Sequence, residues 1–335
     1  METLAAEAYD DGCKMARMPK WAIPFLLVFA VMAAVTSHAQ TAEQAAISRS
    51  AALVRAARPK QAENVLREAL KANPNSESLH GELGRLLFKR ARYEDAVEQL
   101  GMAVQINSNS RVYSMLLAEA LLGWQHFGVA VDFLQAVRDK FGSFPEFHYD
   151  LGLAYYSENK LKEAKPEFEE AVRIAPDLDK AHFLLAACVA SEGDYAHSVE
   201  IFRTLVKTHP ENATYWITLA QMLNHLGSEN LPEALRACKR ARALKPHDPH
   251  IQYVSATVLM QSGDFAGARP LFEHLVSLNP KELEAHVALA RIYGRLGEPE
   301  LAKKETHIVE QIEKEKSAES AAGNPNVPTD AQQPQ

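Results

Sequence analysis

Four of the thirteen histidines recur at the same place in a 34-residue period, and this spacing raises the question of a metal site. They are His80, His148, His182 and His286. A zinc ion needs all its ligands within about 2.0–2.3 Å. Equivalent residues of successive periods are separated by a whole repeat, so we expect these histidines to pack between repeats without a shared metal. His247 and His250 flank a predicted turn and are expected to be solvated.

Cysteine chemistry is equally restricted, because the chain has only Cys13, Cys188 and Cys238. Three cysteines form no disulfide framework. Cys238 occupies a position that phenylalanine fills in other repeats, so we predict a buried apolar thiol. The helices that carry Cys188 and Cys238 are not expected to touch, and we therefore predict that the two are not bridged.

Motifs for catalysis are missing from the sequence. It has no HExxH, GxSxG, phosphate-loop or CxxC pattern. Acidic pairs such as Glu169-Glu170 fall on predicted exposed helix faces. We therefore predict a protein that is not an enzyme and that binds no metal or other cofactor.

The composition is that of a globular protein, with 47% hydrophobic and 24% charged residues. The net charge is −7, and lysine and arginine form no large cluster. We therefore expect neither nucleic acid nor anionic lipid headgroups as ligands. At 335 residues the chain exceeds what one compact core normally fills. An array of repeats escapes this limit, because each repeat contacts only its neighbours.

A 34-residue period organises the chain from Glu43 onward. Position 20 of each copy holds alanine or serine, as two closely crossing helices require. Position 32 is proline in five copies, which ends a helix and turns the chain. The sixth copy is two residues longer, with the excess near Glu229 to Pro232. The eight copies begin at Glu43, Glu77, Arg111, Pro145, Asp179, Ala213, Pro249 and Leu283.

The turns inside the copies show helix-capping patterns. Gly193-Asp194 and Gly263-Asp264 each place a glycine where a helix ends and an aspartate where the next begins. Pro299 suits the first position of a helix. Pro166 and Pro270 fall about one turn into a predicted helix, where we expect a mild bend.

The copy from Pro145 to Leu178 has the clearest pattern and identifies the family. It carries Leu151-Gly152 at positions 7 and 8, Tyr155 at 11, Ala164 at 20, Phe168 at 24, Ala171 at 27 and Pro176 at 32. This pattern resembles the tetratricopeptide repeat, a helix–turn–helix unit of this length. The resemblance implies an all-α, superhelical solenoid of about eight stacked repeats over residues 40–316.

In this family the first helix of each repeat lines a concave surface, mainly through positions 2, 5, 9 and 12. We call these positions the inner face. Apolar and aromatic side chains dominate there, and tyrosine suits a binding surface, although part of the stripe can also be core between repeats. The resemblance places a partner-binding groove on Arg85, Phe88, Met115, Glu119, Leu122, Tyr149, Leu153, Tyr156, Phe183, Ile217, Gln221, Asn224, Tyr253 and Met260.

Two ligand types known in this family lose support. Co-chaperones that clamp a terminal carboxylate use lysine and asparagine on the inner face, whereas position 5 here holds residues such as Gly81, Met115 and Phe183. The asparagine run of O-GlcNAc transferases at position 6 is also absent. The ligand type that remains is an extended or helical peptide held by apolar contacts.

Both ends of the chain differ from the repeats. Residues 1–39 are predicted to be a signal peptide, with basic residues before the apolar run Trp21–Val35 and a small-x-small site at Ser37-His38-Ala39. The 15-residue run is shorter than the ~20 residues of a spanning helix, and an uncleaved anchor is the alternative. Met15 or Met18 would also give a conventional signal. Residues 317–335 are predicted to be a disordered tail.

These features favour a non-catalytic scaffold or adaptor that binds partner segments along its groove in the periplasm or cell envelope. The alternative is a structural subunit of an envelope machine, such as one for polysaccharide export, pilus assembly or outer-membrane biogenesis. The expected partners are proteins or peptides. A membrane is contacted only if the N-terminal segment stays uncleaved.

Overall fold

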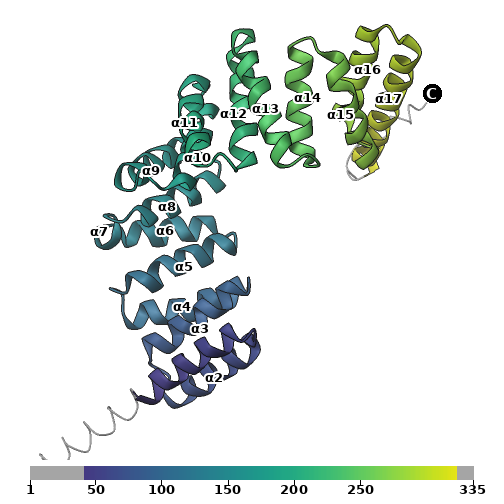
Figure 1. The fold of residues 1–335 in the computed structure, drawn as a ribbon. Coiled ribbons are helices and arrows are strands. Elements are labelled where there is room, and N and C mark those ends of the chain that lie inside the picture. The colour runs from purple at the N-terminus through teal and green to yellow at the C-terminus, as the bar shows by residue number, and fades with distance from the viewer. Residues whose placement is uncertain (1–40, 323–335) are drawn as a thin grey trace, which may run out of the picture. The chain divides into compact units, whose positions relative to one another are not determined.

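The computed structural model describes residues 41–322, and this part of the chain is all-α, as predicted (Figure 1). The predicted signal peptide and residues 323–335 lie outside the described residues. Among the helices of residues 41–322, none is both long and apolar enough to span a bilayer. The chain forms two compact units, which divide between Phe141 and Gly142. We call them the N-terminal unit and the C-terminal unit.

The N-terminal unit is a stack of antiparallel helix pairs. Helix α2 packs on α3, α3 on α4 and α4 on α5. The unit consists of a helix over residues 41–55 followed by α2 (Pro59–Ala72), α3 (Glu77–Lys89), α4 (Tyr93–Ile106), α5 (Arg111–Gly123), α6 (Phe127–Ala136) and the short α7 (Arg138–Phe141).

The C-terminal unit repeats the same arrangement, with each helix packed on the next one along the chain. Its helices are α8 (Pro145–Ser157), α9 (Leu161–Ile174), α10 (Asp179–Ser191), α11 (Tyr195–Thr208), α12 (Ala213–Leu226), the 3₁₀ helix η1 (Ser228–Asn230), α13 (Leu231–Leu244), α14 (Pro249–Gln261), α15 (Phe265–Leu278), α16 (Leu283–Leu296) and α17 (Pro299–Ala322).

The helix boundaries follow the predicted register. From α3 onward, the first helix of every repeat begins at the residue that the sequence places at position 1. The two extra residues of the sixth repeat fall at η1, in the turn between α12 and α13. An insertion there leaves the packed faces of both helices in register.

Small and aromatic residues of the second helices are part of the core. The alanines at position 20 are fully buried from Ala62 to Ala268, whereas Ala302 is only half-buried. At position 24, Phe168, Phe202 and Phe272 are buried. A small residue at position 20 thus lets two helices approach closely, while position 24 fills the space beside it.

The predicted turn chemistry is present. Gly193 and Gly263 have φ values of +87° and +85°, which favour glycine. The Asp194 carboxylate accepts a hydrogen bond from the His197 N–H at 3.0 Å, and Asp264 caps the following helix in the same way. The helices that contain Pro166 and Pro270 are not broken there and continue to Ile174 and Leu278.

The last helix extends into the segment predicted to be a tail. Helix α17 runs to Ala322, six residues further than the predicted end of the solenoid. Half of the segment Ser317–Ala322 is alanine, the best helix former.

The histidines at position 4 pack between repeats, as predicted. The Nε2 atom of His80 lies 2.9 Å from the Pro74 carbonyl oxygen, and His148, His182 and His286 contact the carbonyl six residues earlier in the same way. Trp216 replaces histidine in the sixth repeat and donates to the Pro210 carbonyl. These side chains satisfy carbonyls that a helix end leaves without a partner. Within residues 41–322, no group of three or more His, Cys, Asp or Glu side chains could hold a metal ion.

The buried pair of His148 and Glu167 makes part of the stability depend on pH. Their Nδ1 and carboxylate oxygen lie 2.7 Å apart. Burial opposes protonation, but the Glu167 carboxylate and the Gly142 carbonyl outweigh it and raise the pKa of His148. Because the pKa of His148 is higher in the folded than in the unfolded state, its protonation stabilises the fold. This stabilisation is fully present below the unfolded-state pKa of about 6.5 and disappears as the pH rises through the folded-state pKa.

Replacing Glu167 with glutamine should therefore lower the melting temperature by about 2–4 °C at about pH 6 and by less at about pH 9. Melts of the wild type and E167Q, followed by circular dichroism at both pH values, measure this difference. The matched control is E169Q on the exposed side of α9. Equal losses at both pH values would contradict a charged histidine in the folded state.

Candidate binding surface

In the N-terminal unit, the predicted inner-face residues differ in exposure. Arg85 is exposed and forms an ion pair with Glu82. Phe88, Glu119 and Leu122 are half-buried. Met115 is only 8% exposed, so its assignment to the groove is wrong. Met115 belongs to the buried core of this unit.

A small hollow of about 270 Å³ lies beside Arg85, between the helix at residues 41–55 and α3. Arg55 and Lys89 also line it, together with Val54 and Leu86. Its walls are therefore basic and apolar. Glu82, the partner of Arg85, is the acidic residue of this lining.

In the C-terminal unit, the first part of the inner face is aromatic. The rings of Tyr149 and Tyr156 are half-buried and rest on the fully buried Phe168, at centroid distances of 6.2 Å and 6.5 Å. Lys180 stacks over the Tyr149 ring at 3.8 Å. Leu153 is also half-buried. Packing on Phe168 fixes both tyrosines while leaving part of each ring accessible.

The middle of this stripe is mixed. Phe183 is half-buried against Phe202 and Tyr215. Ile217 is only 1% exposed and belongs to the core of α12 and its neighbours, so its assignment to the groove is wrong. Gln221 and Asn224 are half-buried and polar. The Asn224 side-chain oxygen is buried and has no hydrogen-bond partner among the described residues.

The last part of the stripe opens into a hollow of about 610 Å³. Tyr253 lines it, is 37% exposed and packs against Phe272 at 5.8 Å. Leu278 also lines it and is 56% exposed. His250 and Glu284, both at position 2, stand at its rim. Met260 is half-buried.

Three of these residues are missing from the predicted groove. His250 and Glu284 occupy position 2 of their repeats, so the position rule could have selected them. Leu278 is the last residue of the second helix α15. An apolar residue on that helix is normally assigned to the core, and its exposure was not recognisable from the sequence.

Both described cysteines are unbridged and buried, and burial had been predicted for Cys238. Burial raises the pKa of the Cys188 and Cys238 thiols to about 11. A thiol with so high a pKa is almost entirely protonated at neutral pH and is a poor nucleophile. Both residues therefore act as small apolar side chains.

Comparison with known families gives a direct match. A tetratricopeptide repeat model matches residues 53–120, 155–223 and 259–314, and a second model with the same description matches residues 115–179. Among curated proteins, the BBSome complex member BBS4 of Mus musculus is 24% identical over 245 residues, which cover 73% of this chain and 46% of BBS4. Superkiller protein 3 of Schizosaccharomyces pombe is 25% identical over 115 residues, 34% of this chain and 8% of that protein. The chain thus spans less than half of either relative.

Solved structures show the same fold. A tetratricopeptide repeat protein from Parabacteroides merdae superposes with a TM-score of 0.56 at 14% identity, over 75% of this chain and 99% of that chain. The pilF protein of Pseudomonas aeruginosa also reaches a TM-score of 0.56, at 18% identity, over 66% of this chain and 99% of that chain. At these identities the likeness extends to the fold alone.

Proposed function

Because the chain belongs to the tetratricopeptide repeat family, we propose that it is a non-catalytic scaffold that binds a partner protein segment on the inner face of its C-terminal unit. The observation that carries this proposal is the stripe of accessible aromatic and apolar side chains that ends in the hollow at Tyr253. Tetratricopeptide repeats form stacked surfaces that act by contact, and such a surface needs no reactive group.

The inner face has the properties of a binding surface in three respects. Tyr149, Tyr156 and Tyr253 each rest on a buried phenylalanine, so little side-chain freedom is lost on binding. Tyrosine offers an apolar body with a hydroxyl at its tip. The hollow beside Tyr253, at about 610 Å³, has room for a large side chain of the partner.

We further place this scaffold in the periplasm or cell envelope. This part of the proposal rests on the basic, apolar and small-residue pattern of residues 1–39. Cell fractionation followed by sequencing of the mature N-terminus tests it. A start at Gln40 in the soluble envelope fraction supports an exported scaffold. Recovery within a membrane complex would instead favour a structural subunit, and an intact apolar run would favour an anchor.

The inner face itself is tested with substitutions confined to the surface. The variant Tyr253→Ala/Leu278→Ser/Val287→Ser removes Tyr253 and Leu278 at the hollow and Val287 at position 5 of the last repeat. Leu278 is 56% and Val287 50% exposed. We expect partners captured from envelope extract to be recovered at least about tenfold less, a change that corresponds to about 1.4 kcal/mol. Quantitative mass spectrometry after pull-down measures it.

The matched control is Leu296→Ser/Leu301→Ser, which removes exposed apolar side chains outside the inner face. It should keep wild-type recovery, and circular dichroism melts should be alike for all three proteins. If the inner-face variant recovers every partner as well as the wild type, the groove is not the binding surface.

A further inference from the structure

Helix α13 carries an excess of positive charge in a chain whose net charge is −7. It holds four exposed basic residues, and Lys245 follows directly after it. Its one acidic residue, Glu233, already binds the Arg203 guanidinium. Arg236, Lys239 and Arg242 have no ion-pair partner among the described residues. The sequence-based expectation that basic residues form no large cluster overlooked this helix.

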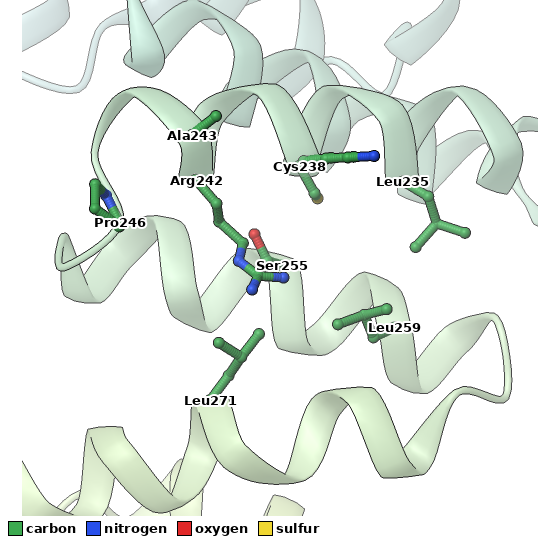
Figure 2. Close-up of a pocket in the computed structure, with 9 residues that line it drawn as sticks. Leu235, Cys238, Arg242, Ala243, Pro246, Ser255, Leu259 and Leu271 are labelled. Atoms are coloured by element: carbon green, nitrogen blue, oxygen red, sulfur yellow. The ribbon is translucent and has the colours of Figure 1, made fainter.

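A cleft of about 550 Å³ opens beside these cations, between α13, α14 and α15 (Figure 2). We call it the α13 cleft. Its apolar lining comes from all three helices, with Leu235 on α13, Leu259 on α14 and Leu271 on α15. Lys239 and Arg242 line it on the α13 side. The cleft therefore combines an apolar floor with two cations that lack an ion-pair partner.

A buried hydroxyl also lines the α13 cleft. Ser255 is fully buried and lies against the Cys238 thiol. In Figure 2, Ser255 projects from α14 toward α13, where Arg242 and Cys238 project to meet it.

The α13 cleft is separate from the inner face. Ser255 and Leu259 are positions 7 and 11 of their repeat, while the inner face uses positions 2, 5, 9 and 12. At about 100° per residue the two sets lie on opposite sides of α14. A ligand in the cleft and a partner on the inner face would therefore contact different surfaces of this helix.

We propose that the α13 cleft binds an acidic peptide segment of a partner protein. One large apolar side chain of the segment lies against Leu235, Leu259 and Leu271, and the neighbouring carboxylates pair with Lys239 and Arg242. Arginine and lysine without partners favour carboxylates at such a mouth. The described lining has no aromatic side chain on which a nucleic-acid base could stack.

A defined probe tests this proposal on the full chain. It is a fluorescein-labelled peptide in which a Leu-Phe pair is flanked on each side by three glutamates. Matched peptides carry glutamines in place of the glutamates, or Ala-Ala in place of Leu-Phe. Fluorescence anisotropy at about 50 mM salt should show at least about tenfold tighter binding of the acidic Leu-Phe peptide than of either control, and a loss of that preference at about 500 mM salt.

Two protein variants separate the cleft from general charge attraction. Lys239→Glu/Arg242→Glu should weaken binding of the acidic peptide by at least about tenfold. Lys162→Glu/Lys207→Glu changes the net charge equally, on exposed residues of α9 and α11, and should change binding less than about twofold. Ala243→Trp keeps every cation but fills the cleft from its exposed rim, and should abolish the preference for Leu-Phe over Ala-Ala.

Three outcomes would contradict the proposal, and each can be recognised separately. Equal weakening by both charge-reversed pairs would show long-range attraction only and would overturn the proposal. Wild-type binding by Ala243→Trp would also overturn it. If phosphatidylglycerol vesicles bind in a manner that requires Lys239 and Arg242 while the acidic peptide does not, the ligand is a membrane surface, and the peptide proposal fails. None of these results depends on the inner face.

Discussion

Replacing Phe168 with alanine is expected to lower the free energy of unfolding of the C-terminal unit by about 3–5 kcal/mol. The side chain is fully buried. The alanine variant loses the transfer energy of a phenyl ring and leaves a cavity that the helices around it can only partly close. Gly152 already lies against the ring so closely that a Cβ there would be 2.8 Å from it, which shows how tightly the site is packed.

The effect should reach the binding surface, because Tyr149 and Tyr156 both rest on this ring. Their half-exposed rings would lose the support that fixes them, so peptide binding at this part of the inner face should weaken even where the fold persists. Urea unfolding followed by circular dichroism measures the stability. Hydrogen exchange over α8 and α9 locates the loss.

Two controls belong with the Phe168 variant. Phe168→Leu retains most of the apolar volume and should cost markedly less than alanine. Leu278→Ala removes an apolar side chain that is 56% exposed and should change stability by less than about 0.5 kcal/mol. A Phe168→Ala protein that unfolds at the same urea concentration as Leu278→Ala would contradict the assigned core.

The helical register was predictable because its determinants are local and recur. Small residues at position 20, proline at position 32 and glycine with aspartate in the turns each act within one repeat, and eight copies make the period unambiguous. The packing of the position-4 histidines between repeats was also predictable, because the same position has the same neighbouring backbone in each repeat. Their carbonyl partners six residues earlier lie within the same short turn.

The exposure of single inner-face residues was not predictable in the same way. Met115 and Ile217 share position 5 with Tyr149 and Tyr253, yet the first two are core and the others are accessible. Exposure at this position depends on the side chains of adjacent helices, such as the Phe202 and Tyr215 rings around Phe183. A position rule cannot contain that information.

The α13 cleft could not be predicted from the sequence for a different reason. Its basic residues are visible in the sequence, but a chain-wide view of charge averages them with the acidic residues elsewhere. That Lys239 and Arg242 lack ion-pair partners, and that Leu259 and Leu271 lie beneath them, follows only from the packing of three helices. Local charge must therefore be assessed together with the contacts that neutralise it.

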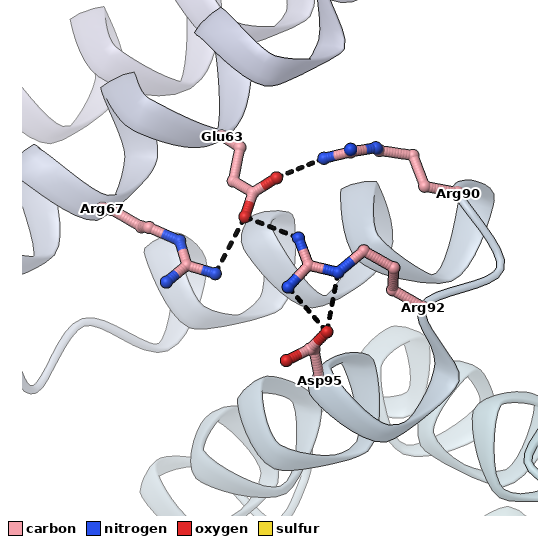
Figure 3. Close-up of polar contacts among 5 residues, drawn as sticks. All are labelled: Glu63, Arg67, Arg90, Arg92 and Asp95. Atoms are coloured by element: carbon pink, nitrogen blue, oxygen red, sulfur yellow. Dashed lines mark hydrogen bonds and ion pairs between the residues drawn. The ribbon is translucent and has the colours of Figure 1, made fainter.

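Replacing Glu63 with glutamine should cost about 1–3 kcal/mol and loosen the first helix pair of the N-terminal unit. Glu63 is buried on α2 and accepts from Arg67 and Arg92 at 2.8 Å and from Arg90 (Figure 3). Arg90 and Arg92 lie in the turn between α3 and α4. One carboxylate thus joins α2 to the next repeat, and partial exposure of the arginines keeps the expected cost below that of a fully buried network.

The same contact recurs with its charges reversed. Position 21 of the fourth repeat, Lys165, pairs with Glu192 at 2.6 Å, and position 21 of the seventh, Arg269, pairs with Glu298 at 2.9 Å. Each links a second helix to the inter-helix turn of the following repeat. Glu63 differs because it serves three cations, so its removal leaves more charge uncompensated than the loss of one partner in a single pair.

Hydrogen exchange over residues 41–72 measures the expected loosening, with Glu68→Gln as the matched control. Glu68 lies on the same helix in an exposed pair with Lys71, a kind of contact worth less than about 1 kcal/mol. Burial opposes ionisation of Glu63, but Arg92 and the other arginines hold its pKa below the usual range. This contribution is therefore present above the unfolded pKa and is lost as the pH falls through the folded one. In Glu63→Gln, the protection of residues 41–72 against exchange should already be low at neutral pH. On acidification this protection should fall less than it does in the wild type. Unchanged protection of residues 41–72 would show that apolar packing of α2 on α3 alone holds this pair in place.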